Sequence, residues 1–333
     1  MMESATVLGA GSWGTALAAM LAARGLRVQF YGRDEALMAE MAVTRRNGRY
    51  LTDVEIPAEV EPVSSLQALR PAPLVVFVTP SKSMAALAAE MGSLGLVDES
   101  TVLLSCSKGV ELGTGRCMTE ILHGVFPQVT VAALSGPNHA EEIARRMPSA
   151  AVVGCLDEGM AIRLQQTFSL PWFRCYTSTD VLGVEWAGAM KNPYAIAAGI
   201  AKGLGLGDNA IAALVTRALA EMVRLGVASG GRTETFYGLS GVGDLVATCY
   251  SEHSRNHRVG LMLGQGRSLS DIMGGMRMVA EGVPNTESLW LCARGRGVRT
   301  PLLDEVHAVL YEQKSPREAL RELFSRDPRP EVD

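Results

Sequence analysis

The sequence lacks a recognisable metal-binding or disulfide motif. Its six cysteines are scattered along 333 residues without a C-x-x-C pair, and its five histidines are also dispersed. In a chain of this length, such cysteines are typical of reduced core residues rather than of a disulfide framework or a zinc site. We therefore expect free thiols and a reaction that uses no metal.

Long apolar runs and an excess of positive charge are also missing. No stretch approaches about 18 uninterrupted apolar residues, which argues against a transmembrane helix. The N-terminus carries Glu3 and no basic region, so we expect no signal peptide and a cytoplasmic location. The formal net charge of −4 argues against a general binder of nucleic acid or membrane surfaces, although a local basic pocket for an anion stays open.

The first half of the chain has the pattern of an α/β domain. Hydrophobic residues make up 47% of the sequence and charged residues 20%, which is enough to build a large core. Short apolar runs alternate with helical patterns, as in a Rossmann-type doubly wound parallel sheet. The predicted strands are 5–8, 27–31, 74–79, 101–106, 130–135, 151–153 and 172–176, and the predicted helices are 14–24, 34–46, 83–92, 116–125 and 157–168.

The residue pattern of the sequence changes near residue 180, where runs of β-branched residues become rare. Only helical patterns follow, over 184–201, 208–228, 256–264, 268–275, 285–295, 302–312 and 316–323. We therefore predict a dinucleotide-binding domain over 1–185 and an all-helical substrate-binding domain over 186–333.

A glycine fingerprint lies close to the N-terminus. Gly9, Gly11 and Gly14 form G-x-G-x-x-G between an apolar strand and an Ala/Leu-rich helix. In a dinucleotide fold the first glycine permits a tight turn, the second lets the backbone approach a pyrophosphate, and the third allows close helix packing. The alternative is an ordinary glycine-rich turn, since the motif alone is weak and gains value only from this context.

The end of the second predicted strand bears on the choice of cofactor. Arg33 and Asp34 lie about 20 residues beyond the glycines, where a dinucleotide enzyme contacts the adenosine ribose. An acid there favours the 2′-hydroxyl of NAD, and an arginine favours the 2′-phosphate of NADP. Arg33 therefore favours NADP(H) over NAD(H). Asp34 has three candidate roles: pairing with Arg33, contacting a ribose, or capping the next helix.

Several motifs in the rest of the chain are more specific than the glycines. They are Ser135–Glu142 (SGPNHAEE), Lys191-Asn192, Thr216–Met222 (TRALAEM), Gly238–Cys249 (GLSGVGDLVATC), Ser254-Arg255-Asn256 and Val279–Gly282 (VAEG). In this order and spacing the sequence resembles bacterial-type NAD(P)-dependent glycerol-3-phosphate dehydrogenases over about residues 5–323.

This resemblance implies a set of functional residues. The proton donor and acceptor falls on Lys191, with Lys108 and Asp244 as its catalytic companions. Substrate contacts fall on Lys108, Gly136, Asn138, Lys191, Asp244, Ser254, Arg255 and Asn256, and we add Thr248 because it lies one helical turn beyond Asp244. Cofactor contacts fall on Gly9, Gly11, Ser12, Trp13, Gly14, Arg33, Tyr50, Lys108, Ala140, Arg255, Val279 and Glu281. The resemblance also implies a homodimer that acts on a small molecule.

Some positions depart from the usual family pattern. Asn138 stands where Ser or Thr is common, and Ala218 replaces a frequent glycine. Pro193 follows Lys191-Asn192 where an aliphatic residue is common. A proline there either kinks a continuous helix or begins a helix that Asn192 caps.

The chemistry of the residues is consistent with a dehydrogenase. A lysine shifts its pKa readily and can protonate the alkoxide that forms when hydride reaches a carbonyl. Asp244 could orient Lys191, Thr248 lies one helical turn beyond Asp244, and Arg255 and Asn256 suit a phosphate. Taken singly, Asp244 reads as a turn residue and Ser254 as a helix cap.

Two other functions stay open at this stage. One is another two-domain β-hydroxyacid or 6-phosphogluconate-type dehydrogenase, which shares the layout and a Lys-Asn pair. The other is a non-catalytic protein that senses dinucleotides. The Ser254–Asn256 block argues against the first, and the joint presence of Lys108, Lys191 and Asp244 argues against the second.

Overall fold

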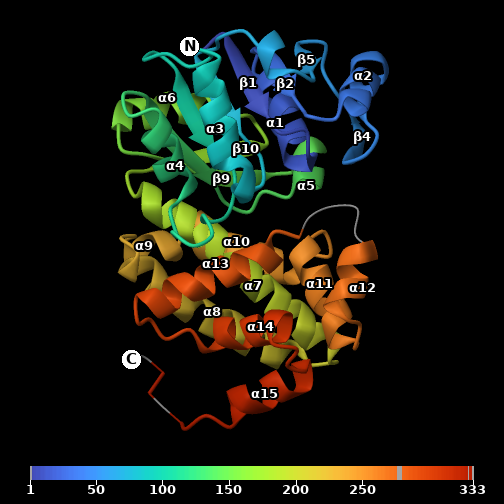
Figure 1. Ribbon diagram of the computed structural model, residues 1–333, viewed down its shortest axis with the longest axis vertical. Coiled ribbons are helices and arrows are strands. Elements are labelled where there is room, and N and C mark those ends of the chain that lie inside the picture. The colour runs from blue at the N-terminus through green and yellow to red at the C-terminus, as the bar shows by residue number, and fades with distance from the viewer. Residues whose placement is uncertain (1, 276–279, 329, 332–333) are drawn as a thin grey trace. The chain divides into compact units, whose positions relative to one another are not determined.

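A computed structural model of the chain describes residues 2–275, 280–328 and 330–331. The chain forms two compact units (Figure 1). Unit 1 consists of Met1–Glu111, Arg116–Gly188 and Gly230–Asp244. Unit 2 consists of Leu112–Gly115, Ala189–Ser229 and Leu245–Asp333.

Unit 1 is built on one eight-stranded sheet with the strand order β10-β9-β8-β7-β6-β1-β2-β5. Its strands are β1 (Ser4–Leu8), β2 (Arg27–Tyr31), β5 (Val60–Val63), β6 (Leu74–Phe77), β7 (Val102–Ser105), β8 (Thr130–Ser135), β9 (Ser149–Cys155) and β10 (Phe173–Ser178). The central strands β1, β6 and β7 are buried on both faces, which explains their continuous apolar sequence. The predicted Rossmann-type sheet is confirmed.

Two features of the sheet differ from the prediction. β9 pairs antiparallel with β8, and the 136–148 connection between them holds the five-residue helix α5 (Ala140–Ala144). In addition, the edge strand β5 and the small hairpin of β3 (Arg46–Asn47) and β4 (Leu51–Glu55) were not predicted. These segments contain many polar residues, and β5 also contains a proline, so they lack the apolar run by which the other strands were predicted.

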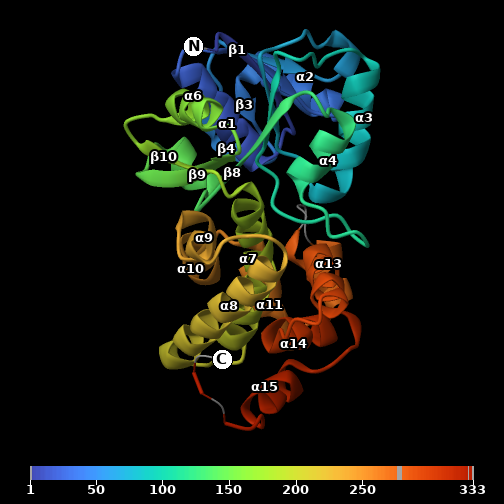
Figure 2. The ribbon, with the colours of Figure 1, turned by 90° about the vertical axis from the view of Figure 1, so that its left-hand side faces the viewer.

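Helices cover both faces of this sheet. Figure 2 shows α3 (Met84–Ser93) and α4 (Met118–Val125) on one side of the strands and α6 (Glu158–Phe168) on the other. α1 (Ser12–Ala23) packs with α6, and their Leu17, Leu21 and Leu164 belong to one buried cluster. Met84, Ile121 and Leu122 belong to the cluster on the opposite face. α2 (Glu35–Thr44) and the short α9 (Thr233–Phe236) complete the unit.

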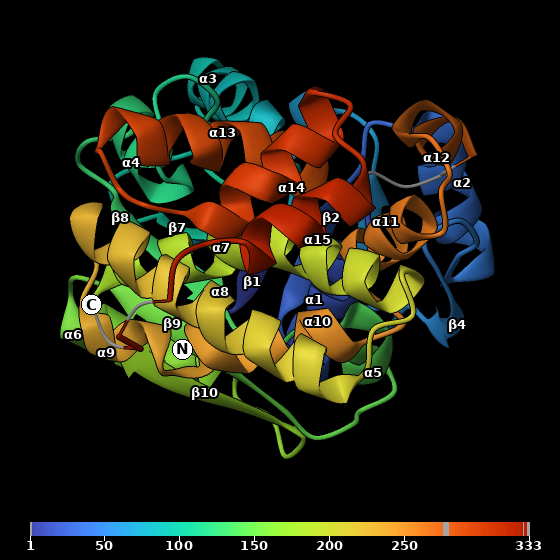
Figure 3. The ribbon, with the colours of Figure 1, turned by 90° about the horizontal axis from the view of Figure 1, so that it is seen from below.

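Unit 2 is helical, as the sequence predicts. Beyond the part of α7 (Val181–Gly203) that follows Gly188, its helices are α8 (Asp208–Ala228), α10 (Asp244–Tyr250), α11 (Arg255–Gly264), α12 (Leu269–Gly275), α13 (Gly282–Gly295), α14 (Pro301–Tyr311) and α15 (Pro316–Phe324). Within this unit α14 lies beside both α13 and α15 (Figure 3). The short helices α5, α9 and α10 were not predicted, nor was the π-helical turn Leu239–Gly243 before α10.

Pro193 lies inside α7, which continues without interruption from Val181 to Gly203. The alternative in which a helix begins at Pro193 is therefore wrong. Because proline has no N–H, its position removes one intrahelical hydrogen bond directly after Lys191 and Asn192. Both of those side chains are buried.

Glycines bring the backbones of α7 and α11 close together. A Cβ on Gly199 would lie 2.0 Å from the carbonyl oxygen of His257, and one on Gly260 would lie 2.0 Å from that of Ile196. Only residues without a side chain fit at such a contact. This close approach holds α11 against the C-terminal half of α7.

Other expectations concern cysteines and membranes. All six cysteine side chains are buried, as expected of core residues. Each helix in the described part of the chain is too short or too polar to cross a lipid bilayer.

Candidate active site

The glycine fingerprint forms a tight turn between β1 and α1. Gly9 has a φ of +125°, and a Cβ there would lie 2.5 Å from the carbonyl oxygen of Val78. A Cβ on Gly14 would lie 1.9 Å from the carbonyl oxygen of Gly9, so both positions exclude a side chain. Gly11 is the N-cap of α1, and a Cβ on it would meet nothing within 4 Å. The backbone N–H groups of this helix start therefore stay accessible to an anion.

The loop of the β3–β4 hairpin is hydrogen-bonded to the same turn. The Ser12 hydroxyl donates to the carbonyl of Tyr50 over 2.7 Å. Asn47 is fully buried, and its Nδ2 donates to the carbonyl of Ala10 at 3.1 Å and to Thr15 Oγ1 at 2.8 Å. The structure thus brings Ser12 and Tyr50 together. Asn47 was missed by the sequence reading, because a single buried asparagine carries no spacing signal.

Asp34 caps the next helix rather than pairing with Arg33. Its Oδ1 accepts a hydrogen bond from the backbone N–H of Leu37 at 3.0 Å, and its Oδ2 pairs with Arg49. The hydrogen bond from Leu37 and the Arg49 guanidinium hold the pKa of Asp34 below its ordinary value. Arg33, at the end of β2, is exposed.

An ion pair in unit 1 joins two predicted catalytic residues. Lys108 Nζ lies 2.6 Å from Asp244 Oδ2 and donates to the carbonyl of Gly136 at 2.8 Å. The Asp244 side chain is 2% exposed, so its charge depends on such partners. It follows the π-helical turn, in which a Cβ on Gly241 would lie 2.0 Å from the carbonyl of Phe236. The glycines of the GLSGVGDL motif therefore form the turn that places this carboxylate.

Polar atoms without a partner gather at the carboxyl ends of β6, β7 and β8. Among the described residues, no hydrogen-bond partner is found for the buried Oγ atoms of Ser105 and Ser135, for Thr79 Oγ1, or for either amide atom of Asn138. The indole nitrogen of Trp13, in the first turn of α1, is also buried without a hydrogen-bond partner among the described residues. In open parallel sheets this edge is where ligands bind. These atoms fit a polar cofactor and substrate, which would supply the missing partners.

Lys191 heads a second group of polar residues, in unit 2. Its Nζ donates to Thr248 Oγ1 over 2.7 Å, and both side chains are buried. The Oδ1 of Asn192 accepts a hydrogen bond from Asn256 Nδ2 at 2.9 Å, and Asn256 Oδ1 accepts one from the Gly282 N–H at 2.9 Å. Asn256 therefore uses both ends of its amide to join α7, α11 and the start of α13. Asn192 was named only as part of a motif, yet it is central here.

The remaining predicted residues lie at helix starts. Ser254 is the N-cap of α11, and its Oγ accepts the N–H of His257 at 3.2 Å. Arg255 is the first residue of α11 and is exposed. Ala140 begins α5, and Glu281 precedes α13. Val279 lies outside the described residues.

One histidine pair has a spacing that the sequence reading overlooked. His253 and His257 are four residues apart, as in H-x-x-x-H. In the described part of the chain, however, no group of three or more His, Cys, Asp or Glu residues is arranged to hold a metal ion.

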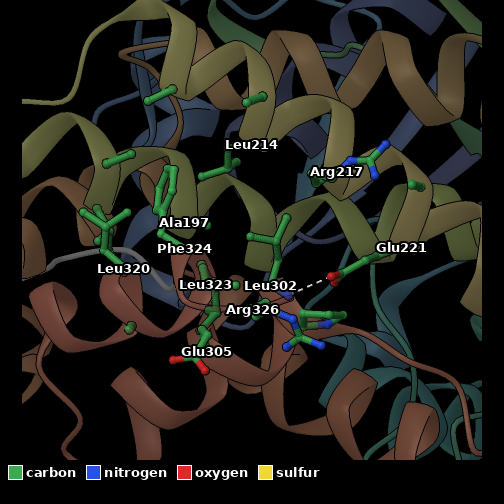
Figure 4. Close-up of a pocket in the computed structure, with 18 of the residues that line it drawn as sticks. Ala197, Leu214, Arg217, Glu221, Leu302, Glu305, Leu320, Leu323, Phe324 and Arg326 are labelled. Atoms are coloured by element: carbon green, nitrogen blue, oxygen red, sulfur yellow. Dashed lines mark hydrogen bonds between the residues drawn. The ribbon is translucent and has the colours of Figure 1, made fainter. Parts of the chain in front are cut away.

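Sequence reasoning also missed a buried carboxylate on α8. Glu221 accepts hydrogen bonds from Tyr194 Oη at 3.0 Å and from the N–H groups of Leu302 and Leu303 at 2.7 and 3.2 Å. Burial raises the pKa of Glu221 to about 7. It borders a cavity of about 590 Å³ between α7, α8, α14 and α15. Figure 4 shows Glu221 and Arg217 toward one end of this cavity and Leu320 toward the other.

None of the residues that line this cavity has been assigned to the cofactor or the substrate. Its walls are mainly alanine, leucine, isoleucine and valine side chains. The candidate functional residues therefore form two groups, the strand-end residues of unit 1 and the Lys191 group of unit 2.

Comparison with known proteins identifies the family. Models of the N-terminal and C-terminal parts of NAD-dependent glycerol-3-phosphate dehydrogenase match residues 4–161 and 180–321. The chain belongs to this family. It is 45% identical to a glycerol-3-phosphate dehydrogenase [NAD(P)+] of Geobacter sulfurreducens over 98% of both chains, and 46% identical to one of Streptomyces coelicolor over 98% of both.

Solved structures of this family agree with the fold. The crystal structure of glycerol-3-phosphate dehydrogenase from Coxiella burnetii has a TM-score of 0.94 and 36% identity, and the match covers 98% of this chain and 99% of that chain. The family relationship makes this chain an oxidoreductase that uses NAD or NADP. The predictions of family, fold and cofactor class are thus confirmed.

Proposed function

We propose that the protein catalyses reversible hydride transfer between NAD(P)H and dihydroxyacetone phosphate, giving sn-glycerol 3-phosphate for phospholipid synthesis. The observation that supports this most strongly is the buried pair of Lys191 and Thr248, whose Nζ and Oγ1 atoms lie 2.7 Å apart. A buried amine with a fixed orientation is the group required to exchange a proton with an alkoxide. Family membership supports the same reaction.

The cofactor supplies the hydride, and the chain's own residues bind and orient it. We assign the dinucleotide to residues 1–185, where the turn at Gly9, Gly11 and Gly14 receives the pyrophosphate. The further cofactor contacts are Ser12, Trp13, Arg33, Tyr50, Lys108, Ala140, Arg255, Val279 and Glu281. NADPH is favoured over NADH, since Asp34 caps α2 and Arg33 is exposed at the end of β2.

We assign the acid and base role to Lys191. In the direction of reduction its ammonium stabilises the oxygen that becomes the C2 hydroxyl and transfers a proton to it. Thr248 accepts a hydrogen bond from Lys191 Nζ and so orients the amine. In the direction of oxidation the neutral amine takes the proton back.

We assign charge recognition to the other polar residues. Lys108 is held between Asp244 and the carbonyl of Gly136, and its positive charge suits a phosphate or an oxyanion. Arg255 provides a planar fork for the substrate phosphate. Asn138, Ser254 and Asn256 complete the substrate residues, and Asn256 acts chiefly by holding Asn192 and Gly282.

One experiment tests the assignment. The oxidation of NADPH and NADH is followed by absorbance with dihydroxyacetone phosphate and then with a panel of 2-oxo acids, and the reduction of NADP+ and NAD+ is followed with 6-phosphogluconate. Oxidation of NADPH by dihydroxyacetone phosphate alone supports the proposal. Turnover with another substrate would indicate a related dehydrogenase, and binding of NADPH without any turnover would indicate a sensor.

We also propose a homodimer and a cytoplasmic location. Exposed apolar side chains on the helices of unit 2, such as the 79% exposed Phe324, support self-association. Light scattering of the purified protein tests the dimer, since a mass near 35.5 kDa would show a monomer.

A further inference from the structure

The acid at the end of β2 is engaged on both of its oxygens. Asp34 Oδ1 accepts the N–H of Leu37 at 3.0 Å, which caps α2, and Oδ2 pairs with Arg49. An acid that binds the adenosine ribose of NAD directs its carboxylate to the 2′-hydroxyl. In this chain the carboxylate of Asp34 is directed instead to a helix start and a guanidinium.

Arg49 owes its position to the glycine-rich turn. The Oδ1 of the fully buried Asn47 accepts hydrogen bonds from the N–H groups of Tyr50 at 3.0 Å and Arg49 at 3.3 Å. The other end of the same amide donates to Ala10 and Thr15, at the start of α1. The loop that carries Arg49 is therefore attached to the turn assigned to the pyrophosphate.

The charges near Asp34 favour an anion. Arg33 precedes Asp34 in the chain and Arg49 pairs with Asp34, so this segment has two arginines near one carboxylate. A guanidinium has five N–H donors, and Arg49 can bind Asp34 while it donates to a second acceptor. The 2′-phosphate of NADP is such an acceptor, whereas the 2′-hydroxyl of NAD has little need of a second cation.

We propose that Arg49 recognises the 2′-phosphate of NADP(H) together with Arg33, and that Asp34 is a positioning residue that holds Arg49. This inference rests on the proposed binding of the dinucleotide to unit 1 and deepens the proposed preference for NADPH. It gives Asp34, in addition to its helix cap, the role of holding a phosphate-binding side chain.

The test measures ligand binding without catalysis. Adenosine 2′,5′-bisphosphate carries the 2′-phosphate, and AMP lacks it. Titration calorimetry of Arg49→Ala is expected to show a loss of about tenfold to a hundredfold in affinity for the bisphosphate, the value of one charge-assisted hydrogen bond. AMP binding is expected to change less than about twofold, as for a surface substitution. Arg27→Ala is the matched control, since Arg27 is exposed at the opposite end of β2.

The role of Asp34 is tested by combining two variants. Asp34→Asn keeps a good helix cap but removes the ion pair with Arg49. In that background Arg49→Ala is expected to cost less than about threefold in bisphosphate affinity, because coupled residues are not additive. AMP binding to Asp34→Asn is expected to equal that of the wild type. Full additivity would overturn the positioning role, and weaker AMP binding would show that Asp34 contacts the ribose.

These outcomes are independent of the proposed reaction. If Arg49→Ala weakens the bisphosphate and AMP equally, the inference is wrong even when the enzyme reduces dihydroxyacetone phosphate. If the bisphosphate results are as expected and no substrate is turned over, the proposed reaction fails and the inference stands.

Discussion

Lys191 Nζ donates a hydrogen bond to Thr248 Oγ1 over 2.7 Å, and both side chains are buried. The two residues are 57 positions apart in the chain and come from α7 and α10. We expect this hydrogen bond to set the direction of the amine that serves as acid and base.

Replacing Thr248 with Val removes the hydrogen bond while it keeps the shape of the side chain. We expect kcat for reduction of dihydroxyacetone phosphate to fall about tenfold, the value of a hydrogen bond of about 1.4 kcal/mol, while KM changes little. Thr248→Ser, which keeps the hydroxyl, is the control and should retain most of the activity. Wild-type turnover by Thr248→Val would show that the hydroxyl does not orient Lys191.

Replacing Lys191 with Ala removes the proposed proton donor, so this variant should lose most turnover. Near-normal reduction of dihydroxyacetone phosphate by Lys191→Ala would exclude Lys191 as the acid.

Replacing Lys108 with Met tests the ion pair in unit 1. The 2% exposed Asp244 side chain would lose the ammonium of Lys108, so we expect the free energy of unfolding to fall by about 3 kcal/mol in addition to a loss of activity. Urea unfolding followed by circular dichroism measures this change. Lys82→Met is the control, since Lys82 lies in an exposed turn. Equal stability of both variants would refute a structural role for the pair.

Arg255→Ala tests recognition of the substrate phosphate. Loss of its guanidinium is expected to raise KM for dihydroxyacetone phosphate at least about tenfold, as for the loss of a charge-assisted hydrogen bond. Arg258→Ala, on the same helix and also exposed, provides the matched control. An unchanged KM in Arg255→Ala would remove this residue from the phosphate site.

The buried Glu221 predicts a dependence of stability on pH. Its pKa rises from 4.5 to about 7 in the folded state because of burial, so the folded state retains a proton that the unfolded state releases. The contribution of Glu221 is therefore fully present below pH 4.5 and is lost as the pH rises toward 7. The free energy of unfolding of the wild type relative to Glu221→Gln should fall by about 1–3 kcal/mol over this range. Urea titrations near pH 4.5 and near pH 7 measure this difference in the free energy of unfolding between the wild type and Glu221→Gln. The same difference at both pH values would contradict the raised pKa.

The contact between α7 and α11 predicts a steric effect. Gly199→Ala and Gly260→Ala each place a methyl group 2.0 Å from a carbonyl oxygen, so each variant should lose about 2 kcal/mol or more of stability. Gly274→Ala on α12 is the control, because its Cβ meets nothing within 4 Å and alanine favours a helix. Thermal unfolding of the three variants measures the difference.

Local patterns predicted most of the elements but not all of the site. The apolar runs and glycines of unit 1 gave β1, β2 and α1 to within about two residues, because most of the residues in those elements are buried. The β3–β4 hairpin has no such run, and its role depends on Asn47, which reaches the first turn of α1 from 32 positions away. No local pattern records a contact of that kind.

The same distinction applies to the charged residues. Family motifs brought Lys108, Lys191 and Asp244 to attention, but the partners of these residues follow only from the tertiary structure. Asp34 is an example: the sequence left three roles open, and the structure shows the helix cap together with a pairing to Arg49. Glu221 carried no motif, because its partners are backbone N–H groups of a helix about 80 residues later.

Each compact unit is assembled from separate stretches of sequence. The chain leaves unit 1 within α7, and residues 230–244 then return to it and end at Asp244. A polypeptide cut at residue 188 would thus encode a nucleotide-binding half that cannot form the Lys108–Asp244 ion pair. The two halves therefore cannot be exchanged between relatives at a single crossover point. Recombination that preserves activity must transfer residues 230–244 together with the N-terminal part.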